Sequence, residues 1–298
     1  MSNAPPAIPA TLIDERTRRL NVNGLQLLCR EWGSVDSPPL VLLHGLRGFS
    51  GTWRALAAHL SAYYRLIAID QRGRGDSDWD PQCNYYTDAY LADLESVVDQ
   101  LHLDRFVLVG HSMGGTTSYV YAASHPERLS ALVIEDIAPG SSVSGAGAQR
   151  IVAEMQELPS SFASWTEARA YWKALRPTLG AAAIEQRLAE SMRGLPTGGV
   201  GWRYDAEGIR TTRANPDPRR IVDLWPVVMR IKTPTLIIRG EHSDFCPAAT
   251  VEAMCERNPS IHSVTVARAG HYVHDDAPEE FRSHLLSFLL PLVDTRTQ

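Results

Sequence analysis

With 298 residues, of which 44% are hydrophobic, the chain is long enough to bury a large core. One α/β domain with an insertion fits this length better than two equal domains. A net charge of −5, without any run of Lys and Arg, argues against nucleic acid as a partner.

Three features of the sequence bear on where the protein works. No apolar segment approaches the roughly 18–20 residues that a membrane span requires. The Pro- and Ala-rich residues 1–10 lack the cationic start and apolar core of a secretory signal. The four cysteines are scattered without metal-ligand spacing, which is typical of reduced thiols. We therefore expect a cytoplasmic protein that binds neither nucleic acid nor membranes.

Short apolar segments recur along the chain and predict the strands of a sheet. The first two form a hairpin over residues 18–32, which turns at Asn23-Gly24. The other predicted strands are 40–43, 65–70, 106–109, 129–135, 235–239 and 262–267. Because helical patterns alternate with them, we expect an α/β fold with a mostly parallel sheet and helices on both faces. The ligand site should lie beyond the carboxyl ends of the strands.

The alternation of strands and helices stops between residue 139 and about residue 230. Only helical patterns occur there, at 149–158, 166–175, 181–192 and 219–229. We interpret residues 139–230 as a helical cap inserted into a core formed by residues 18–138 and 231–298. Residues 1–17 are expected to be a flexible N-terminus.

The predicted cap differs from the rest of the chain in charge. It holds eleven Arg and one Lys against nine acidic residues, so it carries +3 while the remainder carries −8. Arginine-rich helices usually present a solvated face. The alternative is that one or two of these arginines point inward and bind an anionic substrate group through two parallel hydrogen bonds.

A candidate nucleophile follows the predicted strand at 106–109, in Gly110-His111-Ser112-Met113-Gly114. A β-type run that leads into Gly-x-Ser-x-Gly, with a small-residue helical segment after it, is the pattern of a nucleophile elbow. The two glycines permit a sharp turn in which a Cβ would collide with neighbouring backbone. Ser112 would then lie at a helix N-terminus, whose free N–H groups support negative charge.

These features together resemble the α/β-hydrolase superfamily, in which a nucleophile, an acid and a histidine follow in that order. The resemblance covers about residues 20–290. It rests on His44-Gly45, on the segment 70–77 (Asp-Gln-Arg-Gly-Arg-Gly-Asp-Ser), on the elbow and on Gly270-His271. It implies the α/β-hydrolase fold, with a mostly parallel eight-stranded sheet flanked by helices and an inserted helical cap.

The resemblance implies that His271 is the base, because it follows a β-run at the place where the family keeps its catalytic histidine. Ser112 needs such a base within hydrogen-bond reach. His274, three residues later, is the rival. His44 and His111 belong to neighbouring motifs, and we expect them to be hydrogen-bonded structural histidines.

The acid has two candidates. Many family members carry it in a Gly-x-x-Asp-x-x-x-Pro pattern after the seventh strand, but in residues 240–247 that place is taken by Ser243. Asp244 is one residue late, and in a loop such an offset usually turns the side chain elsewhere. Asp136 lies at the end of the predicted strand 129–135, as in the branch that moved its acid there. We favour Asp136 and keep Asp244 as the alternative.

The oxyanion hole should consist of the backbone N–H groups of Leu46 and Met113. Arg47 adjoins it, where its guanidinium either holds a substrate carboxylate or is a plain surface group. Tyr272, next to the expected base, is a second candidate for substrate binding. No Gly-rich loop ending in Gly-Lys-Ser/Thr is present, and no convergent metal ligands are evident, so we expect neither a cofactor nor a metal.

The sequence therefore predicts a cofactor-independent serine hydrolase that cleaves a small ester, lactone or amide through an acyl-enzyme. Carboxylic ester hydrolysis is the first expectation. Amide hydrolysis is the second, because Tyr272 resembles members of the same branch that hydrolyse amides. The positive cap favours a substrate that carries a carboxylate. Two alternatives remain open: a cofactor-free oxygenase or lyase acting on an aromatic ring, and a small-molecule receptor of the same fold with slow turnover.

Overall fold

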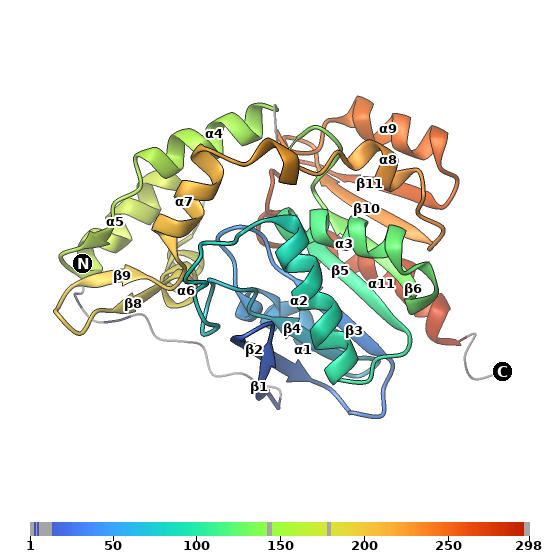
Figure 1. Ribbon diagram of the computed structural model, residues 1–298, viewed down its shortest axis with the longest axis horizontal. Helices are drawn as coiled ribbons and strands as arrows, with labels where there is room; N and C mark the ends of the chain where they lie inside the picture. The colour runs from blue at the N-terminus through green and yellow to red at the C-terminus, as the bar shows by residue number, and fades with distance from the viewer. Residues whose placement is uncertain (1–2, 4, 6–13, 142–144, 178–179, 295–298) are drawn as a thin grey trace.

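The structure is a computed structural model that describes residues 3, 5, 14–141, 145–177 and 180–294. Eight strands form one sheet in the order β1-β2-β4-β3-β5-β6-β10-β11 (Figure 1). The pairs β1/β2 and β2/β4 are antiparallel, and all other neighbours are parallel. This confirms the predicted sheet. Its strands are β1 Arg16–Val22, β2 Leu25–Trp32, β3 Pro39–Leu43, β4 Arg65–Ile69, β5 Phe106–His111, β6 Leu129–Glu135, β10 Thr235–Gly240 and β11 Ile261–Val266.

Helices cover both faces of this sheet, which is why its central strands are apolar without alternation. In β5, Phe106 and Leu108 pack into one core layer, and Val107 and Val109 pack into the other. The first layer is completed by α2 Thr87–Gln100, α3 Met113–Ser124, α8 Leu224–Val228 and α9 Ala248–Arg257. The second layer is completed by α1 Arg54–Leu60, α10 Val273–Asp276 and α11 Pro278–Asp294. Two single 3₁₀ turns, η1 Ser50–Trp53 and η2 Pro126–Arg128, lie in the connections.

The chain enters the sheet slightly earlier than the sequence predicts. β1 begins at Arg16, two residues before the expected start at residue 18. The carboxylate of Glu15 binds Arg30 at 2.6 Å and Arg54 at 2.7 Å, and these ion pairs hold the strand's first residues against the body. Most of the segment 1–17 that we expected to be flexible lies outside the described residues.

Among the described residues between β6 and β10, the helices α4 to α7 and a small sheet form the region drawn on the left of the body in Figure 1. The helices are α4 Ala146–Gln156, α5 Trp165–Leu175, α6 Ala181–Ser191 and α7 Ala206–Ala214. The sequence did not reveal the antiparallel sheet β7-β9-β8, because strands of two or three residues carry no readable alternation. These strands are β7 Ser161–Phe162, β8 Met192–Gly194 and β9 Val200–Trp202.

The helix that we expected over residues 219–229 is absent, and this prediction is wrong. A 3₁₀ turn, η3 Pro218–Arg220, and the short α8 replace it, separated by extended residues. The side chain of Asp217 caps the start of η3 and that of Asp223 caps the start of α8, so two short helical segments form instead of one helix. Leu224, Val227 and Val228 of α8 then pack into the main core rather than into the cap.

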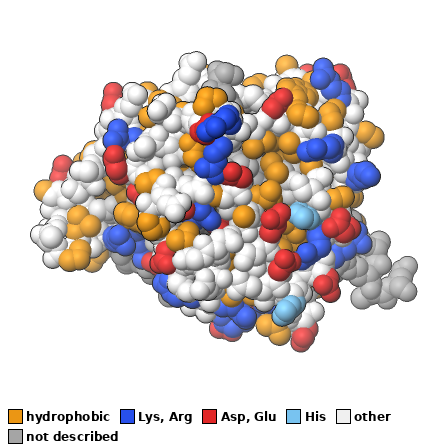
Figure 2. Space-filling model, viewed as in Figure 1, with side chains coloured by type: hydrophobic (Ala, Val, Ile, Leu, Met, Phe, Trp, Pro, Cys, Tyr) orange, Lys and Arg blue, Asp and Glu red, His pale blue; other side chains and the backbone are white. Residues whose placement is uncertain are grey.

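Ion pairs between cap arginines and body carboxylates attach the two regions. They join Arg150 to Asp244, Arg176 to Asp276, Arg187 to Asp275, Arg203 to Asp76 and Arg220 to Asp88. The opposite net charges of cap and body thus meet across their contact. Basic and acidic side chains are also interspersed on the face drawn in Figure 2. Within the described ranges, no helix has the length and apolar character to cross a membrane.

Candidate active site

Ser112 lies at the sharp turn between β5 and α3, with φ 52° and ψ −113°. A positive φ is strained for any residue other than glycine, and such strain is concentrated at functional sites. A Cβ at Gly110 would lie 2.5 Å from the carbonyl oxygen of Gly114, and a Cβ at Gly114 would lie 2.6 Å from that of Leu43. The two glycines therefore permit the close packing that the elbow needs.

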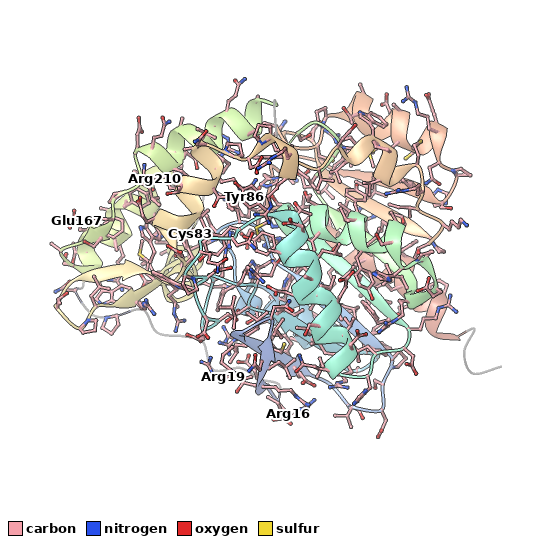
Figure 3. The ribbon with its side chains drawn as sticks, viewed as in Figure 1. Arg16, Arg19, Cys83, Tyr86, Glu167 and Arg210 are labelled. Atoms are coloured by element: carbon pink, nitrogen blue, oxygen red, sulfur yellow. The ribbon has the colours of Figure 1, made fainter. Side chains whose placement is uncertain are left out.

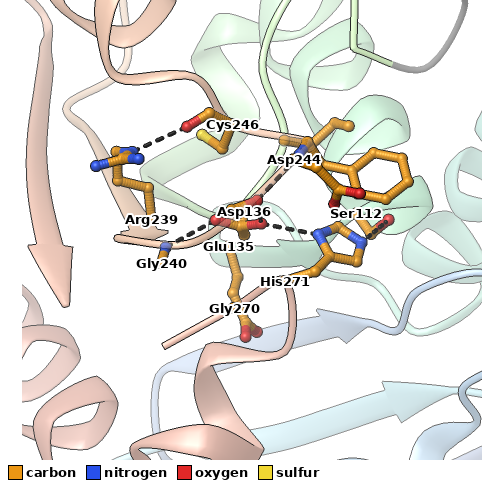
Figure 4. Close-up of polar contacts among 12 residues, drawn as sticks. Ser112, Glu135, Asp136, Arg239, Gly240, Asp244, Cys246, Gly270 and His271 are labelled. Atoms are coloured by element: carbon orange, nitrogen blue, oxygen red, sulfur yellow. Dashed lines mark hydrogen bonds and ion pairs between the residues drawn. The ribbon is translucent and has the colours of Figure 1, made fainter. Parts of the chain in front are cut away.

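His271, in the loop after β11, connects Ser112 to Asp136 (Figure 4). Its Nε2 lies 2.8 Å from Ser112 Oγ, and its Nδ1 lies 2.8 Å from Asp136 Oδ2. The ring stacks on Phe245, with 4.1 Å between the centroids. A serine, an imidazole and a carboxylate therefore lie in line.

Asp136 is held in place by two further hydrogen bonds. The backbone N–H of Gly240 donates to its Oδ1 at 2.8 Å, and the hydroxyl of Ser243 donates to its Oδ2. Burial raises the pKa of Asp136, and these two hydrogen bonds oppose that rise. Ser243 occupies the sequence position where the family pattern places its acid. Its hydrogen bond to Asp136 shows that this position and the end of β6 are adjacent in the fold.

Asp244 faces the cap instead. Its two carboxylate oxygens bind Arg150 of α4, at 2.8 Å from Nε and 3.0 Å from Nη2. This geometry is the bidentate arrangement of a strong Arg–carboxylate pair. The one-residue offset in the sequence therefore directs this side chain away from the imidazole that Asp136 contacts.

The protonation of His271 suits a base. Burial lowers its pKa below the ordinary value near 6.5, so the imidazole is neutral at neutral pH. When the Nδ1–H group of His271 donates a hydrogen bond to Asp136, the lone pair on Nε2 is directed at the hydroxyl of Ser112. The site has the protonation state that a general base requires.

A second histidine–carboxylate pair lies beside the first. Nδ1 of His274, the rival base, lies 2.7 Å from Glu135 Oε1. Nε2 of His111 lies 2.9 Å from the carbonyl oxygen of His271. Possible ligand atoms of His111, Glu135 and His274 lie within 4.8 Å of one another, so these three are the candidate metal ligands within the described ranges. Their contacts with one another and with His271 position the loop that carries His271.

His44 is also a buried, hydrogen-bonded residue. Its Nε2 accepts a hydrogen bond from the backbone N–H of Gln71 at 3.1 Å, and its Nδ1 lies 2.8 Å from the carbonyl oxygen of Gly45. It thereby fixes the start of the loop after β3, which carries Leu46. The sequence predicts such structural contacts for both His44 and His111.

Leu46 and Met113 both line the cavity at Ser112. Among the residues that the structure describes, no carbonyl or side chain accepts a hydrogen bond from either backbone N–H. The fully buried Arg74 connects the two, because its Nε donates to the carbonyl oxygen of Leu46 at 3.2 Å and its Nη2 lies 3.4 Å from Met113 Sδ. Two free donors held beside a nucleophile are what an oxyanion hole requires.

A cavity of about 470 Å³ opens over Ser112 between the body and the cap. Tyr272 and Arg47, the two candidates for substrate binding, both line it. Arg47 is not the plain surface group considered above: it is 8% exposed, and its Nη1 binds Glu154 of α4 at 2.8 Å. Its charge is therefore already matched by a carboxylate from the cap.

Sequence reasoning missed the roles of Arg74, Glu135 and Ser243. Arg74 belongs to the quoted segment 70–77, but its contacts with the oxyanion loop are formed only in three dimensions. Glu135 carried a signal, since it is a carboxylate in an otherwise apolar strand next to the favoured acid. Ser243 was singled out only as the residue that replaces an acid.

Comparisons with known proteins agree with this geometry. The profile described as the α/β-hydrolase fold matches residues 38–278. A Bacillus subtilis protein provisionally named 2-succinyl-6-hydroxy-2,4-cyclohexadiene-1-carboxylate synthase is 32% identical, over 90% of this chain and 96% of its own. The sn-1-specific diacylglycerol lipase ABHD11 of Mus musculus is 28% identical, over 95% of this chain and 92% of its own. The crystal structure of E-2-(acetamidomethylene)succinate hydrolase has a TM-score of 0.81 at 27% identity, covering 93% of this chain and 99% of that one.

Proposed function

The chain belongs to the α/β-hydrolase fold family, and from this premise we propose that it is a cofactor-independent serine hydrolase that cleaves a small ester or amide. One observation carries the proposal: a neutral His271 lies 2.8 Å from both Ser112 Oγ and the buried carboxylate of Asp136. The proposal assigns Ser112 as nucleophile, His271 as base and Asp136 as the acid. It fits the hydrolase activity that the family and several relatives support.

In the first half-reaction, Ser112 Oγ attacks the carbonyl carbon while its proton moves to His271 Nε2. Asp136 stabilises the imidazolium that forms. The oxyanion accepts hydrogen bonds from the N–H groups of Leu46 and Met113. His271 then gives its proton to the leaving alcohol or amine, and the acyl group stays on Ser112.

In the second half-reaction, His271 takes a proton from a water molecule that attacks the acyl-enzyme. A second tetrahedral intermediate collapses, the proton returns to Ser112 Oγ, and the acid product leaves. Each half-reaction uses the same donors and the same base. No step needs an oxidant, a reductant or a metal ion.

The names of the relatives bear on the substrate. One is named for an acetamide of a succinate, and another for a compound that carries a carboxylate and a succinyl group. These names support a small substrate with at least one carboxylate, and the first favours amide cleavage beside ester cleavage. The mouse relative, named as a lipase, favours an ester.

A lyase is the second candidate, because the Bacillus subtilis relative is named a synthase. In a lyase, His271 and Ser112 would remove a proton from the substrate without forming an acyl-enzyme. Mass spectrometry of enzyme quenched during turnover of a 4-nitrophenyl ester separates the two. An acyl adduct on Ser112 supports the hydrolase, whereas ester turnover without any adduct supports base catalysis alone.

Replacement of the nucleophile tests the proposed function directly. Ser112→Ala should lower kcat by more than about 10³-fold, since the hydroxyl that forms the acyl-enzyme is lost. The variant should fold normally, because the elbow tolerates a smaller side chain, and circular dichroism checks this. A Ser112→Ala enzyme whose activity stays within tenfold of wild type would refute the proposal.

A further inference from the structure

The wall of the cavity over Ser112 is unusually rich in positive charge. Three of its lining residues are arginines, Arg47, Arg213 and Arg220, and within the described ranges the lining contains no Asp or Glu. Most of the other lining side chains are apolar or aromatic, and a charge among them is weakly screened. Such a cavity favours a ligand with negative charge.

Two of these arginines are already neutralised. Arg47 binds Glu154 at 2.8 Å. Arg220 binds both carboxylate oxygens of Asp88 and the side-chain oxygen of Asn84, and its guanidinium stacks 4.0 Å from the ring centroid of Tyr86. Each of these two guanidinium charges is therefore matched by a carboxylate, although Nε and Nη2 of Arg47 have no hydrogen-bond partner among the described residues.

Arg213, in the last turn of α7, differs from both. No ion pair or hydrogen bond links it to any residue in the described ranges. Its side chain is partly buried and lines the cavity. Burial lowers its pKa, as does the charge of Arg74, while Tyr90 and Tyr86 oppose this effect.

An arginine in such a place remains protonated at neutral pH and lacks a counter-charge. A partly buried charge without a partner is less stable than a paired one, and a carboxylate that binds it would supply the missing counter-charge. The planar guanidinium also fits a carboxylate through two parallel hydrogen bonds. The cap arginines described above bind carboxylates of the body, which leaves Arg213 available for one that the substrate brings.

We propose that Arg213 binds a carboxylate of the substrate while the scissile carbonyl lies between Ser112 and the oxyanion donors. This inference rests on the proposed hydrolase function and adds the anion-binding residue to it. Arg213, Ser112, Leu46 and Met113 all line the same cavity.

The test uses three mono-4-nitrophenyl esters, those of succinic, glutaric and adipic acid, each compared with its methyl ester at the other carboxyl group. The measured quantity is the ratio of kcat/KM for the acid to kcat/KM for its neutral methyl ester. We expect the wild-type ratio to exceed one for at least one chain length. Arg213→Gln should lower that ratio roughly 10- to 100-fold, the range typical of a charged hydrogen bond.

Arg210→Gln is the matched control, because Arg210 lies one turn earlier on α7, is partly exposed and is already paired with Glu207 (Figure 3 labels Arg210 and Tyr86). It should leave the ratio within twofold of wild type. An Arg213→Gln enzyme that keeps the wild-type ratio overturns the proposal. Equal losses for the acid and the methyl ester also overturn it, since they indicate a general structural role.

Measurement of ligand binding tests the role of Arg213 without depending on turnover. In the Ser112→Ala background, calorimetry should show that Arg213→Gln weakens binding of the best mono-4-nitrophenyl acid about tenfold or more, with little change for its methyl ester. Equal affinities with and without Arg213 overturn the anion site even if the enzyme is a hydrolase. Conversely, a clear loss of binding in Arg213→Gln supports the anion site. If none of the six esters is turned over in a Ser112-dependent way, that result counts against the proposed function alone.

Discussion

Two neighbouring carboxylates at the active site have different tasks because their contacts differ. Asp136 is fully buried and accepts hydrogen bonds from Gly240, Ser243 and His271. Asp244 binds the guanidinium of Arg150 on α4. The first geometry orients an imidazole and stabilises its charged form, and the second attaches the cap to the body. The contacts of each side chain, rather than its place in a motif, decide which one serves the reaction.

Asp136→Asn should lower kcat by about 10²- to 10⁴-fold, because an amide can impose the wrong tautomer on His271 and cannot stabilise the imidazolium. Asp244→Asn should keep kcat within about tenfold of wild type, since its contact lies outside the triad. Steady-state kinetics with one 4-nitrophenyl ester measures both. If Asp244→Asn proves the more damaging change, the assignment of Asp136 as the acid is wrong.

At the scale of elements, the site is built where β3, β5, β6 and β11 end. The elbow after β5 supplies Ser112, and the loop after β3 supplies Leu46. The last residue of β6, Glu135, and the next residue, Asp136, bind His274 and His271 from the loop after β11. Two consecutive carboxylates thus bind two histidines that are three residues apart, so the loop after β11 is held at both positions.

The loop after β3 leaves no room for a side chain at Gly45. A Cβ there would lie 2.6 Å from His111 Nδ1 and 3.3 Å from Ser112 Cβ. Gly45→Ala should therefore displace Leu46 from the oxyanion and lower kcat by about 10²–10³-fold, the effect of losing one such donor. The measurement is kcat on a 4-nitrophenyl ester, together with the melting temperature.

Gly194→Ala in β8 provides the control for Gly45→Ala, because a Cβ at Gly194 meets nothing within 4 Å. It should leave both kcat and the melting temperature close to wild type. A Gly45→Ala enzyme with kcat within threefold of wild type would show that the N–H of Leu46 does not act in the reaction.

For the molecule as a whole, the sequence predicts the body well and the cap poorly. Buried strands such as 106–109 are apolar on both faces and are followed by glycine-containing turns. Local sequence patterns are therefore enough to predict the sheet and the elbow. Even the choice between Asp136 and Asp244 could be made from the sequence, because Asp244 is one residue late in the family's Gly-x-x-Asp-x-x-x-Pro pattern. The strands of the three-stranded cap sheet are too short to show periodicity. The division of residues 219–229 into two short helical segments depends on two capping aspartates, Asp217 and Asp223.

The partners of charged side chains are the other part that the sequence does not reveal. Arg47 and Glu154 are 107 residues apart in the chain, and only the folded cap brings them together. The +3 charge of the cap indicated that some arginines meet negative charge, but not which ones. The structure shows that several of them bind body carboxylates, and that Arg213 has no such partner in the described ranges. Charge patterning predicts an attraction between regions, but it does not reveal which arginine is left without a carboxylate partner.

Two buried histidines, His44 and His111, make stability depend on pH. Burial lowers the pKa values of His44 and His111 to about 3. In the unfolded chain these groups take up protons below about pH 6.5, but in the folded protein they do so only near pH 3. Their contribution to stability is therefore full above about pH 6.5 and falls as the pH is lowered. His271 and His274 add little, because burial also raises the pKa values of their partners Asp136 and Glu135 to about 7. Between pH 6 and pH 4.5 each pair therefore binds about one proton in both the folded and the unfolded state.

The free energy of unfolding should thus fall by up to about 3 kcal/mol per pH unit between pH 6 and pH 4.5, at about 1.4 kcal/mol for each of the two protons. Denaturant titrations at a series of pH values measure this slope. His44→Gln, which removes one titrating group, should reduce the slope by about half, whatever its effect on stability at pH 7.5. His262→Gln, at an exposed position of β11, should leave the slope unchanged. A wild-type free energy of unfolding that stays constant from pH 6.5 to 4.5 would mean that His44 and His111 can be protonated in the folded state, and that the packing around the elbow and the oxyanion loop opens to admit the charge.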